Sequence, residues 1–161
     1  MEGDHLHSFG STGDGAFPGV GALILDQYGN LYGTTDIGGP AGYGTVFMLS
    51  PQANGYWKET ILHSFSQGAN GDHVSAGVVM DQAGILYGTT IAGGTQCDCG
   101  VVYKLAPQAN GKWTYTVLHR FNGGDGDGPD ANLILDQKGN LYGTAPNGGF
   151  NGGGVVFEIT P

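Results

Sequence analysis

The hydrophobic positions of this chain fall into short runs that return about every 55 residues, so that the same pattern occurs three times. Each repeat opens with a nearly continuous apolar run, at residues 22–25, 77–80 and 132–135. Continuous apolar runs of this length are typical of strands that are buried on both faces. A fixed period in this range indicates stacked supersecondary units.

Three further apolar runs follow in each repeat. The second contains the sequence Leu-Tyr-Gly-Thr, at residues 31–34, 86–89 and 141–144. The third covers residues 45–49, 101–105 and 155–159, and the fourth covers residues 57–65 and 113–121. The fourth run alternates large apolar residues with other residues at a period of two, which is the period of a strand. No segment of ten residues has helical periodicity, so we predict an all-β chain with four strands in a repeat.

Two kinds of connection join these strands. Short turns with Asp at the start and Gly near the end occupy residues 26–30, 81–85 and 136–140, and the sequence Pro-Gln-Ala-Asn-Gly fills a second turn at 51–55 and 107–111. Such turns predict antiparallel hairpins. The remaining connections are longer and differ between repeats. Four antiparallel strands joined in this way describe a β-propeller blade, with the tight turns on one face and the long loops on the other.

Three blades are fewer than the four to eight that close a propeller ring. We therefore predict that the chain is a single propeller segment, residues 1–161, with repeats at about 7–62, 63–118 and 119–161 and a spare outer strand at residues 4–9. The ring is expected to close by oligomerisation, with the chain as its own partner. A homodimer gives a six-bladed ring, and a trimer with nine blades is the alternative.

The pattern Ala-Leu-Ile-Leu-Asp-x-x-Gly-Asn-Leu-Tyr-Gly-Thr-Thr at residues 22–35, followed by Gly38-Gly39 and by Gly-Thr-Val-Phe at 44–47, resembles the GloVer repeat of choice-of-anchor tandem-repeat proteins. It is also similar to a longer form of the NHL propeller blade. The second repeat departs from the pattern with Ile85 in place of the turn Asn. The resemblance implies a propeller and an extracellular or cell-surface setting, because these are bacterial proteins that are mostly surface-bound or exported. It implies no activity.

The charge of the chain narrows the class of partner. Five Lys and Arg residues stand against 14 Asp and Glu residues, and the net charge is −9. A nucleic-acid binder needs a basic surface, and an anionic membrane disfavours an acidic protein, so we expect neither partner. No apolar run approaches the roughly 18 residues of a membrane-spanning helix. The first four residues include the acids Glu2 and Asp4 and no basic residue, and no apolar stretch follows them, so we expect no signal peptide here. Cations, glycans and polar peptides remain as ligands.

The predicted long loops hold the candidate ligand-binding residues. Aromatic side chains beside acids suit sugars, since rings stack on apolar sugar faces while carboxylates accept hydroxyl groups. The alternative is that these rings pack on the edge of the blade and that the loop histidine, His73, has no role in binding. The candidates are Phe17, Asp36, Tyr43, Asp72, His73 and Phe150.

One loop is a candidate calcium site. Asp125, Asp127 and Asp130 are closely spaced on a glycine-rich segment, and calcium prefers oxygen ligands on such loops. The segment lacks the spacing of an EF-hand. The alternative is a solvated acidic loop.

Other polar residues recur in every repeat and are expected to be structural. Repetition at a scaffold position favours packing or a hydrogen bond between blades for the histidines, with a metal or catalytic role as the alternative. It favours packing for the tyrosines and turn formation for the aspartates. These residues are His7, His63 and His119; Tyr32, Tyr87 and Tyr142; and Asp26, Asp81 and Asp136. Cys97 and Cys99 are expected to form a loop disulfide or to stay as free thiols, because one Cys-x-Cys is at most half of a zinc site.

No catalytic motif is present in the sequence. We therefore expect a non-catalytic binding or structural module that contacts a glycan, a peptide or a cation on its acidic loop face. The alternative is a metal-dependent lyase or hydrolase, since several six-bladed propellers with NHL-like blades hold a metal at the mouth of the central channel.

Overall fold

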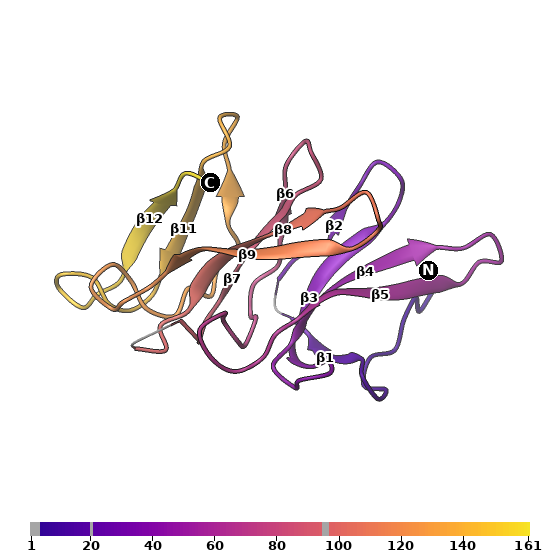
Figure 1. Ribbon diagram of the computed structural model, residues 1–161, viewed down its shortest axis with the longest axis horizontal. Helices are drawn as coiled ribbons and strands as arrows, with labels where there is room; N and C mark the ends of the chain where they lie inside the picture. The colour runs from indigo at the N-terminus through magenta and orange to yellow at the C-terminus, as the bar shows by residue number, and fades with distance from the viewer. Residues whose placement is uncertain (1–3, 20, 95–96) are drawn as a thin grey trace.

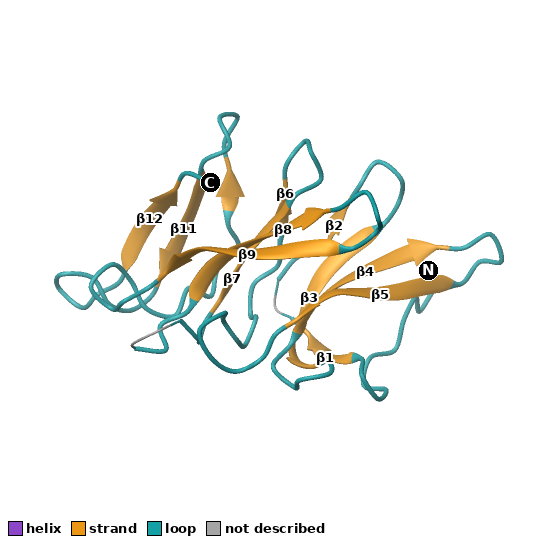
Figure 2. Ribbon diagram, viewed as in Figure 1, coloured by secondary structure: helices purple, strands orange, loops and turns teal. Residues whose placement is uncertain are grey.

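The computed structural model describes residues 4–19, 21–94 and 97–161, and every regular element in these ranges is a β-strand (Figure 2). The strands form three antiparallel sheets that follow one another along the chain. In Figure 1 the first sheet lies at the right, the second in the middle and the third at the left. The predicted all-β, antiparallel fold is confirmed.

Each sheet is built from one repeat. The first contains β1 (Gly15–Pro18), β2 (Ile24–Leu25), β3 (Leu31–Gly38), β4 (Thr45–Pro51) and β5 (Trp57–Ser64). The second contains β6 (Val79–Met80), β7 (Leu86–Thr90), β8 (Val101–Pro107) and β9 (Trp113–Arg120). The third contains β10 (Ile134–Leu135), β11 (Leu141–Ala145) and β12 (Val155–Ile159).

The strands differ from the prediction at their ends. The first strand of each repeat is shorter than its apolar run, because only two residues of each run pair with the next strand. Strand β1 was not predicted, since its sequence Gly-Ala-Phe-Pro has no strand pattern, and it pairs with the far end of β3. That pairing extends β3 to Gly38, so Phe17 and Asp36 lie in strands and not in loops as expected. Residues 4–10 form no strand in the single chain.

The register is the same in all three sheets. Tyr32, Tyr87 and Tyr142 each face the first residue of the short first strand. A β-bulge interrupts the pairing of β4 with β5 after Val46, and the same bulge follows Val102 between β8 and β9. The three repeats therefore share one geometry as well as one sequence pattern.

The aspartate at the start of each tight turn organises that turn. Oδ1 of Asp26 accepts hydrogen bonds from the amides of Tyr28 and Asn30, and Oδ2 accepts one from the hydroxyl of Tyr32 at 3.0 Å. Asp81 and Asp136 make the same bonds in their own repeats. This geometry agrees with the structural role expected for these aspartates and tyrosines, because their polar atoms form hydrogen bonds with one another and with the turn backbone.

The hydrophobic core lies between successive sheets. Side chains of β3, β4 and β5 pack against those of the second repeat, with Val46, Phe65 and Tyr103 fully buried. A second cluster joins the second and third sheets around Val102, Phe121 and Leu141. The end of each fourth run packs into the following sheet: Phe65 contacts Tyr103, and Phe121 contacts Phe157. Each sheet is thus stabilised mainly by its neighbours.

Successive sheets approach one another closely just before the short first strand of each repeat. A Cβ atom on Gly21 would lie 1.8 Å from the amide nitrogen of Gly77, so only glycine fits there. The amide of Gly77 in turn donates to Oδ1 of Asn132 at 2.7 Å. Residues 22, 77 and 132 are equivalent in the three repeats, and Gly21 directly precedes this position in the first repeat. These contacts connect each sheet to the next.

Candidate functional site

One backbone position in each repeat has a left-handed conformation, just before the short first strand. It is occupied by Phe17 (φ 54°), His73 (φ 54°) and Gly128 (φ 66°). A left-handed φ is uncommon for residues other than glycine and is an outlier for a bulky side chain. Such strain persists only where the surroundings enforce it, and it is concentrated at binding sites. Phe17 and His73 are therefore the first candidates for a functional surface.

In the second and third repeats, a backbone hydrogen bond to the preceding repeat holds this conformation. The amide of His73 donates to the carbonyl of Tyr43 at 3.3 Å, and the amide of Gly128 donates to the carbonyl of Cys99 at 2.9 Å. The carbonyl of His73 accepts a hydrogen bond from the amide of Ile91 at 3.0 Å. The position is thus fixed to two neighbouring loops.

A pocket of 340 Å³ lies at the junction of the first two repeats, lined by Phe17, Pro18, Gly19, Asp36 and Ser75. The Phe17 side chain borders it and is 71% exposed. The hydroxyl of Ser75 is buried and has no hydrogen-bond partner among the described residues. A buried hydroxyl without a partner is costly, and a ligand hydroxyl would satisfy it.

The predicted candidates Tyr43 and His73 extend this pocket. Nδ1 of His73 lies 3.5 Å from Oδ1 of Asp36, and both side chains are about half exposed. The Tyr43 ring meets the His73 ring edge-on, with centroids 5.9 Å apart, and its hydroxyl donates to Gln67. The structure therefore brings Phe17, Asp36, Tyr43 and His73 together, and it adds Ser75, which the sequence analysis missed. We name these five residues the junction pocket.

Two of the predicted ligand-binding residues lie elsewhere. Asp72 is buried and pairs with Ala92 through its backbone, and it does not line the pocket. Burial, with a smaller contribution from Asp98, raises the pKa of Asp72. Phe150 is fully exposed at the tip of the loop between β11 and β12.

The three predicted calcium ligands do not form a compact group. Asp125 accepts hydrogen bonds from the amide and side chain of Asn122, and its Oδ2 lies 3.1 Å from Nε2 of His119. Asp127 pairs through its backbone with Asn147. Among the described residues, no set of ligand atoms within 4.8 Å of one another includes these aspartates. Calcium binding by Asp125, Asp127 and Asp130 stays a prediction of the sequence.

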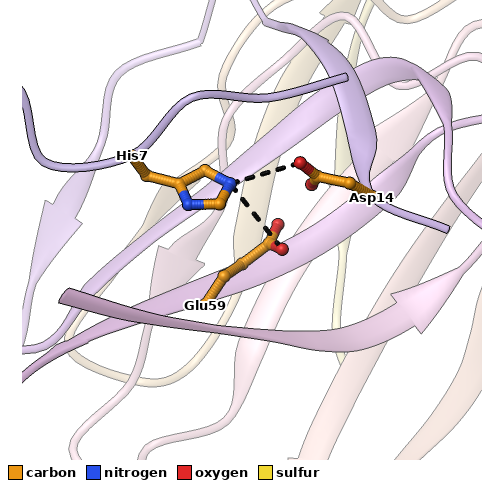
Figure 3. Close-up of side chains that lie close together, drawn as sticks. All are labelled: His7, Asp14 and Glu59. Atoms are coloured by element: carbon orange, nitrogen blue, oxygen red, sulfur yellow. Dashed lines mark hydrogen bonds and ion pairs between the residues drawn. The ribbon is translucent and has the colours of Figure 1, made fainter. Parts of the chain in front are cut away.

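A compact set of metal-ligating side chains does occur in the first repeat, at His7, Asp14 and Glu59 (Figure 3). The sequence analysis favoured packing or a hydrogen bond between blades for His7, with a metal role as the alternative, and it did not single out Glu59. A comparison of the repeats could have identified Glu59, because the equivalent residue of the second repeat is Tyr115.

A larger hollow of 790 Å³ lies on the opposite, tight-turn side, between the turns at 26–30 and 81–84. Its two aspartates, Asp26 and Asp81, already accept hydrogen bonds from their own turns. The carboxylates of this hollow are therefore used within the scaffold, and the junction pocket is the better candidate.

The loop between β7 and β8 is closed by two local contacts. Cys97 and Cys99 form a disulfide, which agrees with one of the two states expected for them. Oδ1 of Asp98 accepts a hydrogen bond from the amide of Gly93 at 2.7 Å. These contacts fix the loop that also accepts the hydrogen bond from Gly128.

The repeated histidine of the second repeat is part of the core. The His63 ring stacks on Tyr115, with centroids 4.0 Å apart and the planes at 5°. Burial lowers the pKa of His63 to about 4, so the ring is neutral at neutral pH. This geometry agrees with the packing role expected from its repetition.

Comparison with known proteins gives one family. Residues 22–161 match the family model described as the Gloeobacter/Verrucomicrobia repeat. The match covers most of the chain and all three sheets except β1. No curated protein matches the chain. Within the described residues, no helix has the length and apolar character to cross a membrane.

Proposed function

The chain belongs to the Gloeobacter/Verrucomicrobia repeat family, and we propose that it is a non-catalytic binding and structural module made of β-propeller blades similar to NHL blades. Each sheet is one blade in this proposal, within the repeat limits expected from the sequence. The junction pocket on the side of the long loops is its ligand site.

The observation that carries the binding role is that Phe17 and His73 have left-handed conformations and that both lie beside Asp36 in the junction pocket. Such conformations cost about 1–3 kcal/mol each. Both residues could be replaced by glycine without loss of a large core contact, as Gly128 illustrates at the same position of the third repeat. A ligand that contacts these side chains would account for their presence.

The chemistry of the pocket favours a neutral glycan. The exposed Phe17 ring offers an apolar face, Asp36 and His73 offer hydrogen-bonding groups, and the Ser75 hydroxyl has no partner among the described residues. The net charge of −9 disfavours anionic ligands. A polar peptide is the second class that fits, because it offers similar hydrogen bonds without the flat apolar face of a sugar ring.

Saturation-transfer NMR and titration calorimetry with cellohexaose, chitohexaose and mannohexaose test this role. We expect binding to at least one of them in wild-type protein, and a loss of about tenfold in affinity on Phe17→Ala, since one aromatic contact contributes about 1.4 kcal/mol. Phe150→Ala removes another exposed ring and serves as the control. Absence of binding to all three sugars would remove glycans as the ligand class.

The partner of the module is proposed to be a second copy of the chain, which completes a six-bladed ring. Support comes from side chains of the third sheet that are exposed although their counterparts are buried. Thr144 and Val156 are exposed, whereas Thr34 and Val46 at the same positions of the first sheet are buried. On the first sheet, Leu23 is exposed, whereas Leu133 at the same position of the third sheet is buried. The exposed face of the first sheet and that of the third therefore carry residues that, in other repeats, are buried against a neighbouring repeat.

An extracellular or cell-surface location is part of the proposal. The disulfide between Cys97 and Cys99 supports it, because disulfides persist in oxidising compartments. The alternative function, a metal-dependent lyase or hydrolase with its site at the channel mouth, has less support. The compact ligating set of the first repeat includes Glu59 of β5, the strand farthest from the inner edge of the sheet.

A further inference from the structure

Three side chains from separate segments meet at the outer part of the first sheet. His7 comes from the N-terminal segment, Asp14 from the connection before β1, and Glu59 from β5 (Figure 3). Nε2 of His7 lies 3.3 Å from Oδ2 of Asp14 and 3.8 Å from Oε2 of Glu59. One ligand atom from each residue lies within 4.8 Å of the other two.

The two carboxylates are poorly satisfied for groups at this depth. The Asp14 side chain is 8% exposed and the Glu59 side chain 15% exposed. Oδ1 of Asp14 and Oε1 of Glu59 are buried and have no hydrogen-bond partner among the described residues. No Lys or Arg forms an ion pair with this group in the described part of the chain, so an additional positive charge would stabilise it.

The second and third repeats provide an internal comparison. In the second repeat the equivalent residues are His63, Asn70 and Tyr115, and the tyrosine ring stacks on the histidine. In the third repeat His119 and Asp125 form the same pair as His7 and Asp14, at 3.1 Å. Of the first two repeats, the first has His, Asp and Glu together, and the second has a tyrosine in place of the Glu. Where the acids are replaced, an aromatic ring fills the space, so the fold itself does not require the two carboxylates.

We propose that His7, Asp14 and Glu59 bind a divalent transition-metal ion, with zinc as the preferred species. Zinc accepts imidazole nitrogen and carboxylate oxygen at about 2.0–2.2 Å, and calcium prefers oxygen ligands alone. Two such ligands on a tetrahedral ion lie roughly 3.4 Å apart, which is close to the separations of the Nε2 and carboxylate oxygen atoms here. Two carboxylates balance the charge of the ion, and the fourth position is left for water.

The ion would attach the N-terminal segment to the first sheet. Residues 4–10 form no strand, and the Phe9 ring already packs on Phe47. The His119–Asp125 pair shows that the histidine keeps this position when its own segment is part of a strand. The site is therefore compatible with the role of a spare outer strand that the sequence predicts for residues 4–9.

Zinc titration of the tag-free, metal-free chain by calorimetry tests the site, together with melting curves in zinc and in chelator. We expect one zinc ion per chain and a higher melting temperature in zinc. Glu59→Gln and His7→Gln are each expected to weaken zinc binding by about a hundredfold, since even indirect partners of a metal site contribute 10–100-fold. Asp125→Asn changes the counterpart of Asp14 in the two-residue pair of the third repeat, and it is expected to leave zinc binding unchanged.

The double variant Asp14→Asn, Glu59→Tyr copies the arrangement of the second repeat, and it separates loss of the site from loss of the fold. We expect it to melt in chelator at or above the temperature of the wild type and to show no shift in zinc. Equal zinc affinity in the wild type and this variant would overturn the proposal, as would the absence of zinc binding by the wild type. Glycan binding at the junction pocket is measured separately, so the two proposals fail independently.

Discussion

Val156 holds the same position in the third sheet that Val46 holds in the first, yet Val156 is 81% exposed and Val46 is fully buried. Val102, the counterpart in the second sheet, is also fully buried. The two buried valines are covered by the sheet that follows them. An apolar side chain of this kind on a sheet face marks an interaction surface when its neighbours are exposed as well.

A charge at this position should prevent assembly. Val156→Glu places a carboxylate in the proposed contact between two copies, and we expect the dissociation constant of the assembly to rise by at least about 30-fold, which corresponds to about 2 kcal/mol. Sedimentation equilibrium measures the change. Tyr56→Glu, in an exposed turn away from this face, is the control. Equal association of the two variants would argue against the third sheet as the contact.

Replacing the strained Phe17 should stabilise the chain. Phe17 has a φ of 54° and is 71% exposed, so Phe17→Gly removes strain at little loss of buried area. We expect the free energy of unfolding to rise by about 1 kcal/mol, measured by urea denaturation. Phe150→Gly, at an exposed position without a left-handed φ, should lower it by about 0.5–1 kcal/mol through backbone entropy. If both variants were destabilised equally, the strain argument for the junction pocket would lose its support.

The turn aspartates should contribute to stability. Oδ1 of Asp81 accepts hydrogen bonds from the amides of Ala83 and Ile85, and Oδ2 accepts one from Tyr87. We expect Asp81→Ala to lower the free energy of unfolding by about 2 kcal/mol, because hydrogen bonds to charged groups contribute about 1.5–3 kcal/mol when buried and less near solvent. Gln82→Ala in the same turn is the control and should change stability by less than about 0.5 kcal/mol.

The stability of the chain should fall as the pH decreases from about 6.5 to 4 because of His63. The pKa of His63 is lowered by burial to about 4, whereas in the unfolded chain it returns to about 6.5. Between these values the unfolded state binds a proton that the folded state does not, so acid favours unfolding. His63→Phe keeps a ring against Tyr115 and should flatten this part of the melting-temperature curve. An unchanged slope in the variant would mean that other groups cause the acid dependence.

The sequence predicted the repeated strands well, because a strand buried between two sheets must carry a continuous or alternating apolar pattern. It also identified Asp36 and His73 as candidates, since both are polar residues that do not recur at a scaffold position. It did not predict β1, whose pairing is decided by contacts with β3 and not by its own residues.

The remaining parts of the sites depend on contacts that a linear pattern does not contain. The left-handed conformation of His73 accompanies hydrogen bonds to two other loops, and the unpartnered Ser75 hydroxyl depends on its neighbours in space. Glu59 could have been found by comparing the repeats residue by residue, because it replaces an aromatic residue within an otherwise alternating strand. Its proximity to His7 and Asp14 could not have been found in this way.

The mass of the tag-free chain in solution tests the central claim most directly. Sedimentation velocity at micromolar concentration should show a species of twice the 16.6 kDa chain mass, as expected for two copies that close one six-bladed ring. A species of three times that mass would keep the contact between copies and replace the six-bladed ring by the nine-bladed one. A single species of 16.6 kDa across the micromolar range would contradict the account.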